Sequence, residues 1–197
     1  NHGNMCFFSF QAIKHLTTVD GGALVLPSQD LYQRTKLLRW YGIDRESNRK
    51  DFRCEEDIPE WGYKFHMNDI NASIGLANLK EVQKNVIEKN IDNAWYYNRE
   101  ITLLDGITKL KETPGCSYWL YTALVEKQSD FMRMMEEKGV MVSRVHERND
   151  KHSCVQEFRT SLPNLDKVTK KMICIPNGWW VTKEQREYIA DCIKGGW

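Results

Sequence analysis

The sequence predicts an α/β fold, and three observations support this prediction. In the second half of the chain, short apolar runs that alternate like strands are followed by segments with helical periodicity, and this order recurs. Ser, Thr or Asn precedes several helical segments and Gly follows them, as expected at helix ends. With 197 residues, of which 41% are hydrophobic, the chain can bury a core in one large or two small domains.

The chain begins with a predicted β-hairpin. Residues 6–10 are apolar and aromatic, so we expect a short buried strand there. Asp20-Gly21-Gly22 predicts a turn, and residues 23–26 predict a second strand. Lys14 would therefore lie in the connection between the two strands.

Two helices are expected next, separated by a loop. Ser28 can cap a helix over residues 29–41, with Gly42 just past its end. Residues 43–62 are polar, charged and aperiodic, which predicts a loop. Asn68 can cap the second helix, which is expected to be long.

The long helix is expected to bury one continuous apolar stripe. Gly75 within it costs about 1 kcal/mol relative to alanine, so we expect another part of the backbone to pack closely there. The residues that recur at three- and four-residue steps are Ile70, Ile74, Ala77, Leu79, Val82, Val86, Ile91 and Trp95.

The second half predicts a compact unit of alternating strands and helices. We expect two domains, residues 1–100 and residues 101–197, with the long helix bridging them. One helix should start after Ser129 and stop at Gly139, and another should start after Thr182 and stop at Gly195. Strands are predicted over residues 107–113, 117–126, 140–146 and 171–176.

Composition and charge exclude several classes of function. With 28 basic and 27 acidic residues, the chain gives no electrostatic reason to expect nucleic acid or an anionic membrane as a partner. No apolar run approaches the roughly 18 residues of a membrane span. The six cysteines are widely spaced and contain no CxxC pair, which favours free thiols and a cytoplasmic location. Phosphate-loop, dinucleotide-binding and GxSxG motifs are absent from the sequence.

Lys14 has two interpretations on spacing alone. It can be a loop lysine whose stem packs while its ammonium reaches water. It can also be a Schiff-base lysine, because an apolar setting favours the neutral amine that attacks a carbonyl. Ser9 could then hydrogen-bond a phosphate, and Thr17 and Thr18 offer further hydroxyls.

Several segments in order resemble one family over essentially the whole chain. They are "SFQAIKHLTTVDGGALV", "LLRWYGIDR", "GYKFHMNDINASIGLANLKEV", "YWLYTALV", "GVMVSRVHERND" and "CIPNGWWVTKEQREYI". The first resembles the lysine motif of the DegT/DnrJ/EryC1/StrS family of sugar aminotransferases, which use pyridoxal phosphate. In the first segment this chain has Asp20 where the family usually has Glu, and His15 where the family commonly has Asn.

The resemblance implies a fold, a reaction and site residues. The fold is of the aspartate aminotransferase type (fold type I), of which this chain would supply the remainder of the large domain and the small C-terminal domain. Lys14 would hold pyridoxal phosphate and move a proton, and Ser9 would contact the cofactor phosphate. His66 takes the position that reaches the phosphate in the neighbouring subunit of a homodimer; the alternative is a helix-entry residue with a packed ring.

The implied reaction transfers an amino group from an amino acid, commonly glutamate, to a keto group on a nucleotide-linked sugar, in amino-sugar biosynthesis. The family places the carboxylate for the cofactor ring upstream of the lysine, and no such residue precedes Lys14 in this sequence. This chain alone is therefore expected to have little or no activity. The alternatives are a non-catalytic remnant, a subunit that needs a complementary N-terminal half, and a binding module with a surface Lys14.

Two further groups of residues have the composition of a binding site, one for a metal ion and one for a sugar or base. The polar residues between His146 and Cys154 match no standard zinc spacing, so no metal is predicted. Trp179 and Trp180 could stack on a sugar or base, but packing in the core or at a domain interface is favoured, because large aromatic side chains mostly bury their area.

Overall fold

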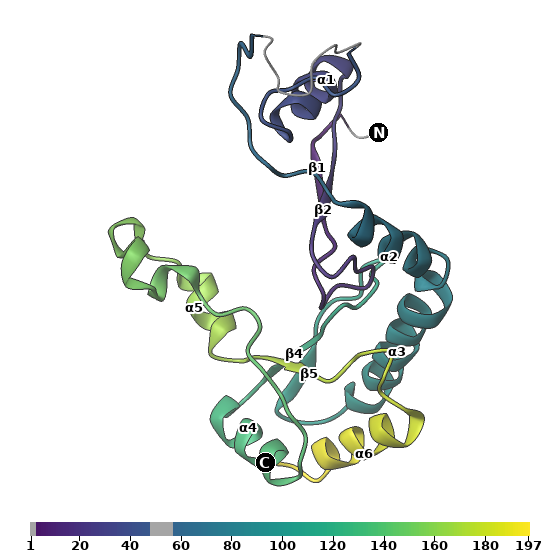
Figure 1. Cartoon of the computed structure of the whole chain (residues 1–197). Coiled ribbons are helices and arrows are strands. Elements are labelled where there is room, and N and C mark those ends of the chain that lie inside the picture. The colour runs from purple at the N-terminus through teal and green to yellow at the C-terminus, as the bar shows by residue number, and fades with distance from the viewer. Residues whose placement is uncertain (1–2, 48–56) are drawn as a thin grey trace. The chain divides into compact units, whose positions relative to one another are not determined.

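The structure, a computed structural model, describes residues 3–47 and 57–197 (Figure 1). It divides into two compact units, Asn1–Lys80 and Glu81–Trp197. The mixture of helices and strands confirms the α/β prediction. The predicted division into residues 1–100 and 101–197 stays a prediction.

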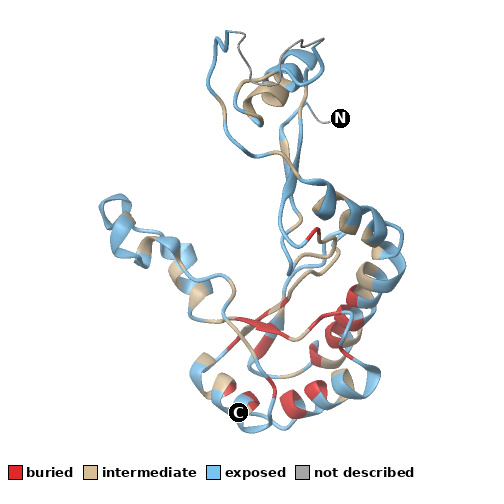
Figure 2. Cartoon of the chain, viewed as in Figure 1, coloured by how far each residue is buried: buried red, intermediate tan, exposed pale blue. Residues whose placement is uncertain are grey.

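The first unit begins with the predicted hairpin. Strand β1 (Cys6–Ser9) pairs antiparallel with β2 (Gly22–Val25), with Cys6 opposite Val25 and Ser9 opposite Gly22. The expectation of a buried strand was wrong, because the side chain of Phe7 is 78% exposed and all of β2 is exposed (Figure 2). A two-stranded sheet has two open faces, and no other described element covers them in this unit.

Helix α1 (Gln29–Leu38) has the predicted start but ends before the predicted residue 41, with Arg39 as its C-cap. The Ser28 hydroxyl accepts a hydrogen bond from the Leu31 N–H at 3.4 Å. Gly42 adopts a φ of +82°, and its N–H donates to the Leu37 carbonyl at 2.9 Å. The predicted loop over residues 43–62 contains no helix or strand where it is described, and residues 48–56 lie outside the described residues.

The predicted long helix is interrupted. Helix α2 (Asp69–Leu79) starts at the Asn68 cap as expected and is followed by a π-helical turn, η1 (Gln83–Ile87), and then by α3 (Glu88–Ile101). A π turn has more residues per turn than an α-helix, so apolar residues at three- and four-residue steps do not stay on one face.

The predicted buried apolar stripe is wrong along the whole segment. No residue of α2 is buried, and Ile70 and Leu79 are 75% and 56% exposed, while in α3 Trp95 is 63% exposed. The buried face of α3 carries three asparagines, and its residues are Asn90, Asn93, Ala94, Tyr97, Asn98 and Ile101. These asparagines bond to loops: Asn93 donates to the Gly178 and Val181 carbonyls at 3.2 and 3.4 Å, and Asn90 donates to the Tyr118 carbonyl at 3.3 Å.

The second unit holds the core (Figure 2). A three-stranded antiparallel sheet, in the order β3-β4-β5, packs with α3, α4 and α6 around a cluster that includes Phe131. The bounds are β3 (Ile107–Lys109), β4 (Tyr121–Val125), α4 (Gln128–Glu137), η2 (Asn149–Lys151), η3 (Ser153–Phe158), α5 (Pro163–Thr169), β5 (Met172–Ile175) and α6 (Lys183–Lys194).

Two of the expected features in this unit differ. Helix α4 is preceded by Lys127 in a left-handed conformation, so Ser129 is not its cap, although Gly139 ends it with a φ of +72° as predicted. Residues 140–146 pair with β5 only at Ser143, which forms an isolated bridge with Cys174, so the predicted strand is absent. An alternating pattern becomes a strand only where a partner runs beside it for several residues.

The caps of α6 and the free thiols of the described cysteines agree with the sequence predictions. Thr182 and Gln185 form a reciprocal capping box at the start of α6, and Gly195 caps its end. The five described cysteines are free thiols, and Cys54 lies outside the described residues. Within residues 3–47 and 57–197, no helix has the length and apolar character needed to cross a bilayer.

Candidate active site on the Lys14 loop

The loop that carries Lys14 is closed by backbone hydrogen bonds. This loop, called here the Lys14 loop, comprises residues 10–21 between β1 and β2. The Phe10 N–H donates to the Gly21 carbonyl, and the Thr18 N–H donates back to the Phe10 carbonyl, both at 2.9 Å. The Thr17 hydroxyl also donates to the Phe10 carbonyl, at 3.2 Å. The loop is therefore folded onto the end of the hairpin rather than extended into solvent.

Lys14 and Ser9 are linked through Gln11. The Lys14 N–H donates to the Gln11 carbonyl at 2.9 Å, and the Gln11 N–H donates to the Ser9 hydroxyl oxygen at 3.4 Å. Lys14 is half-buried and Ser9 is exposed. Burial lowers the pKa of the neighbouring His15 and so favours its neutral imidazole.

His66 belongs to a different cluster of the same unit. Its ring meets the Trp40 ring edge-on at 3.9 Å, and its Nδ1 is shielded from solvent without a hydrogen-bond partner in the described chain. Desolvation first, and then the charges of Lys64, Arg45 and Arg39, lower its pKa. The neutral imidazole can donate one hydrogen bond but carries no charge toward a phosphate. Its predicted role at a cofactor phosphate stays a prediction.

One face of α2 contacts the Lys14 loop, and the sequence reasoning missed most of it. The Asn78 side-chain amide donates to the Thr17 carbonyl at 2.9 Å, and the Asn71 amide donates to the Asp20 carbonyl at 3.2 Å. Gly75 lies between them on the same face. Asparagine is a poor helix former, so two asparagines inside a helix were a signal that they bond elsewhere.

The expected close approach at Gly75 is present, but it is made by a side chain. A methyl group added at Gly75 would lie 2.5 Å from Cγ2 of Thr18, which is too close for any contact. Thr18 is 3% exposed, and its hydroxyl donates to the Asp20 carbonyl, so its side chain is held in place. Gly75 thus leaves the space that Thr18 of the Lys14 loop occupies.

A Gly75→Ala substitution is expected to displace the Lys14 loop. The overlap costs about 1–3 kcal/mol, of which the better helix propensity of alanine returns about 1 kcal/mol. Amide hydrogen exchange over residues 10–21 should become faster. Adding Thr18→Ser removes the overlapping methyl and should restore the slow exchange. Unchanged exchange in Gly75→Ala, or no recovery in the double variant, would contradict this account.

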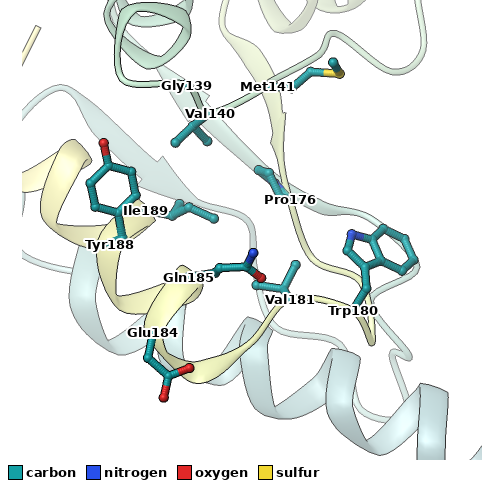
Figure 3. A pocket seen from close by; sticks show the side chains of 10 residues that line it. All are labelled: Gly139, Val140, Met141, Pro176, Trp180, Val181, Glu184, Gln185, Tyr188 and Ile189. Carbon is teal, nitrogen blue, oxygen red and sulfur yellow. The ribbon is translucent and has the colours of Figure 1, made fainter.

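A separate pocket of about 430 Å³ lies on the second unit (Figure 3). Its wall includes Val140, Met141, Pro176 and Trp180, and its polar groups are largely engaged already. The Tyr188 hydroxyl donates to the Lys138 carbonyl at 2.9 Å, and Gln185 belongs to the capping box.

Two other groups were candidate sites in the sequence: the tryptophan pair and the polar residues between His146 and Cys154. Trp179 and Trp180 are exposed and meet edge-on at 5.9 Å, so they do not pack in the core of the described chain, and their packing at a domain interface stays a prediction. They follow Gly178 in a loop that bonds to α3 through its backbone, which leaves their rings outside. Among the described residues, no three His, Cys, Asp or Glu side chains come together as metal ligands would.

Known proteins resemble the chain throughout. The profile of the DegT/DnrJ/EryC1/StrS aminotransferase family matches residues 1–194. The structures of AtS13 from Actinomadura melliaura (46% identical) and of the sugar aminotransferase CalS13 from Micromonospora echinospora (41% identical) both match all of this chain with a TM-score of 0.94. This chain covers 52% and 53% of them, respectively.

A curated relative gives the same result. The UDP-4-amino-4,6-dideoxy-N-acetyl-beta-L-altrosamine transaminase of Campylobacter jejuni subsp. jejuni serotype O:2 is 32% identical over 200 residues. The match includes 96% of this chain and 51% of the transaminase, so the chain spans about half of the length of that relative. These matches confirm the predicted aspartate aminotransferase-like fold class.

Proposed function

Since the chain belongs to the DegT/DnrJ/EryC1/StrS aminotransferase family, we propose that the complete protein transfers an amino group from glutamate to the keto group of a nucleotide-linked sugar. Its relatives are enzymes, among them a sugar aminotransferase and a transaminase of a UDP-linked sugar. The observation that carries the proposal is the placement of Lys14, which is half-buried on a closed loop at the end of a hairpin.

The groups around Lys14 suit pyridoxal phosphate. Lys14 supplies a primary amine for the aldehyde, and Ser9 supplies a hydroxyl whose oxygen accepts from the Gln11 backbone N–H, while the Gln11 carbonyl accepts from the Lys14 backbone N–H. Gly21 adopts a φ of +123°, which lets the backbone turn sharply after the loop. When bound, the cofactor supplies an electron sink for the substrate carbon.

The residues of this chain have two tasks in the proposed reaction. The Lys14 amine binds the cofactor covalently and, once released by the amino donor, accepts a proton from the substrate carbon and returns it. Because the same nitrogen performs both tasks, its position relative to the loop backbone decides the rate. The Ser9 hydroxyl donates to a phosphate oxygen and so keeps the cofactor near this amine.

A second copy of the chain is the proposed protein partner. Trp61, Tyr63 and Phe65 alternate along an extended segment and are exposed. The Tyr63 and Phe65 rings stack at 4.8 Å, and the Trp61 and Tyr63 rings meet at 5.2 Å. An exposed aromatic row of this kind is typical of a protein interface. It lies just before His66, which in the proposed homodimer reaches the phosphate site of the neighbouring subunit.

The alternatives receive less support. A non-catalytic remnant would have no need to close the Lys14 loop or to keep hydroxyl groups beside the lysine. A binding module with a surface Lys14 leaves unexplained why the profile of an aminotransferase family matches residues 1–194. The free thiols of the described cysteines support the proposed cytoplasmic location.

The half-reaction with the amino donor tests the proposal. With pyridoxal phosphate and glutamate, the complete protein is expected to release one 2-oxoglutarate per active site, and further turnover should require a keto nucleotide-sugar. A polypeptide of residues 1–197 alone should release little or none, because the family supplies the cofactor-ring carboxylate from upstream of the lysine. If the complete protein released neither 2-oxoglutarate from glutamate nor the corresponding 2-oxo acid from any other amino donor, the proposed function would be refuted.

A further inference from the structure

The face of α2 that meets the Lys14 loop is made of residues at helical spacing. Asn71, Gly75 and Asn78 are separated by four and three positions, so they lie in one row along the helix. Each of them contacts a different residue of the loop. The Asn71 amide donates to the Asp20 carbonyl, Gly75 leaves space for the Thr18 side chain, and the Asn78 amide donates to the Thr17 carbonyl. Lys14 precedes this stretch by three residues.

Thr17 is the point where the hydrogen bonds of the loop converge. Its hydroxyl donates to the Phe10 carbonyl at 3.2 Å and accepts from the Val19 N–H at 2.9 Å, while its carbonyl accepts from Asn78 at 2.9 Å. Val19 has a φ of +70°, which is uncommon for a β-branched residue and persists only where the surroundings hold it. Loss of the Asn78 bond would therefore allow the backbone on both sides of Thr17 to relax.

We propose that Asn78 is a positioning residue for Lys14: its amide fixes the Thr17 carbonyl and thereby places the Lys14 amine for covalent capture of the cofactor. This inference rests on the proposed function. In the capture step, the lysine nitrogen adds to the aldehyde carbon of pyridoxal phosphate, a carbon–nitrogen double bond forms, and the aldehyde oxygen leaves as water. The rate depends on where the nitrogen is held when the aldehyde arrives.

Asn78 is distinguished from Asn71 by burial. The bond from Asn78 to Thr17 is partly buried, whereas the bond from Asn71 to Asp20 is exposed. Water can replace an exposed hydrogen bond but does so poorly at a buried carbonyl, which is then left unsatisfied. The larger effect on the loop is therefore expected from Asn78.

The experiment compares capture in the complete protein with that in three substituted forms. Each is mixed with pyridoxal phosphate, the double bond is reduced with borohydride at set times, and the label at Lys14 is measured by mass spectrometry against the label on the other lysines. Asn78→Ala removes the donor and favours the helix, and Asn78→Gln keeps an amide on a longer stem. Asn85→Ala is the control, because Asn85 is exposed and its amide donates to the Glu81 carboxylate four residues away at 2.7 Å.

We expect Asn78→Ala to slow capture at Lys14 about tenfold, while the label on the other lysines and the unfolding midpoint change no more than in Asn85→Ala. Asn78→Gln should recover most of the rate. Capture by Asn78→Ala at the unsubstituted rate, or failure of glutamine to recover any of it, would overturn the positioning role and leave the proposed function intact. An alanine form that does not fold would assign Asn78 a purely structural role. If the unsubstituted protein does not capture the cofactor preferentially at Lys14, the proposed function fails and this inference fails with it.

Discussion

Replacing Lys14 with alanine is expected to abolish covalent capture of pyridoxal phosphate by the complete protein. The capture needs an uncharged primary amine held near groups that bind the rest of the cofactor, and Lys14 is the lysine on the closed loop that follows Ser9. Absorbance of the cofactor with and without borohydride reduction, followed by peptide mapping, measures the effect. The unsubstituted protein should carry the label at Lys14.

A Lys14→Arg form is the matched control for charge. Arginine keeps a long cationic side chain but has no amine that forms this bond. If Lys14 acted only as a surface cation, the arginine form would bind the cofactor as the unsubstituted protein does. We expect the arginine form to fail as the alanine form does. Equal spectra and equal labelling of the unsubstituted and alanine forms would remove Lys14 from the proposed site.

Replacing Phe131 with alanine is expected to lower the free energy of unfolding of the second unit by about 3–5 kcal/mol. Phe131 lies on α4 with 0% of its surface exposed, and its ring meets the Trp197 ring edge-on at 4.9 Å. Removing the ring loses buried apolar area and leaves a cavity that the surrounding strands fill only in part. Denaturant unfolding monitored by tryptophan fluorescence measures the change.

Phe158→Ala is the control for this prediction. Phe158 ends the short η3 helix and is 72% exposed, so the same change should alter the free energy of unfolding by less than about 0.5 kcal/mol. Similar effects of the two substitutions would contradict the assignment of the core. They would indicate that the packing around α4 differs from the cluster described above.

Sequence patterns predicted local features well, because neighbouring residues decide them. The caps at Ser28, Asn68 and Thr182 were all confirmed, since each depends on one side chain and an N–H three residues away. Ser129 was wrong as a cap because Lys127 takes a left-handed conformation and moves the start of α4. The strands β1 to β5 were predicted, but the extra strand over residues 140–146 was not found, because pairing requires a partner far away in the sequence.

The roles of Lys14 and Ser9 at the candidate site stay predictions, and the residues that support the Lys14 loop were not predicted. Lys14 and Ser9 were identified from residue type, spacing and resemblance, and the structure links them through Gln11. Asn78 was missed because it bonds to a residue 61 positions away. The phase of α3 was missed because a π turn shifts the helix, and nothing in the composition of Gln83–Ile87 signals such a turn.

The inward face of α3 reverses the usual relation between hydrophobicity and tolerance to mutation. Two of its asparagines, Asn90 and Asn93, donate hydrogen bonds to backbone carbonyls of loops. The free-energy cost of replacing either asparagine is therefore set by the buried carbonyls that lose their hydrogen-bond donor. A leucine at Asn93 would score as an improvement by any hydropathy measure, yet it would release the turn before α6 that carries the two neighbouring tryptophans. In this part of the molecule, a more hydrophobic side chain is therefore expected to make the attached loops less ordered.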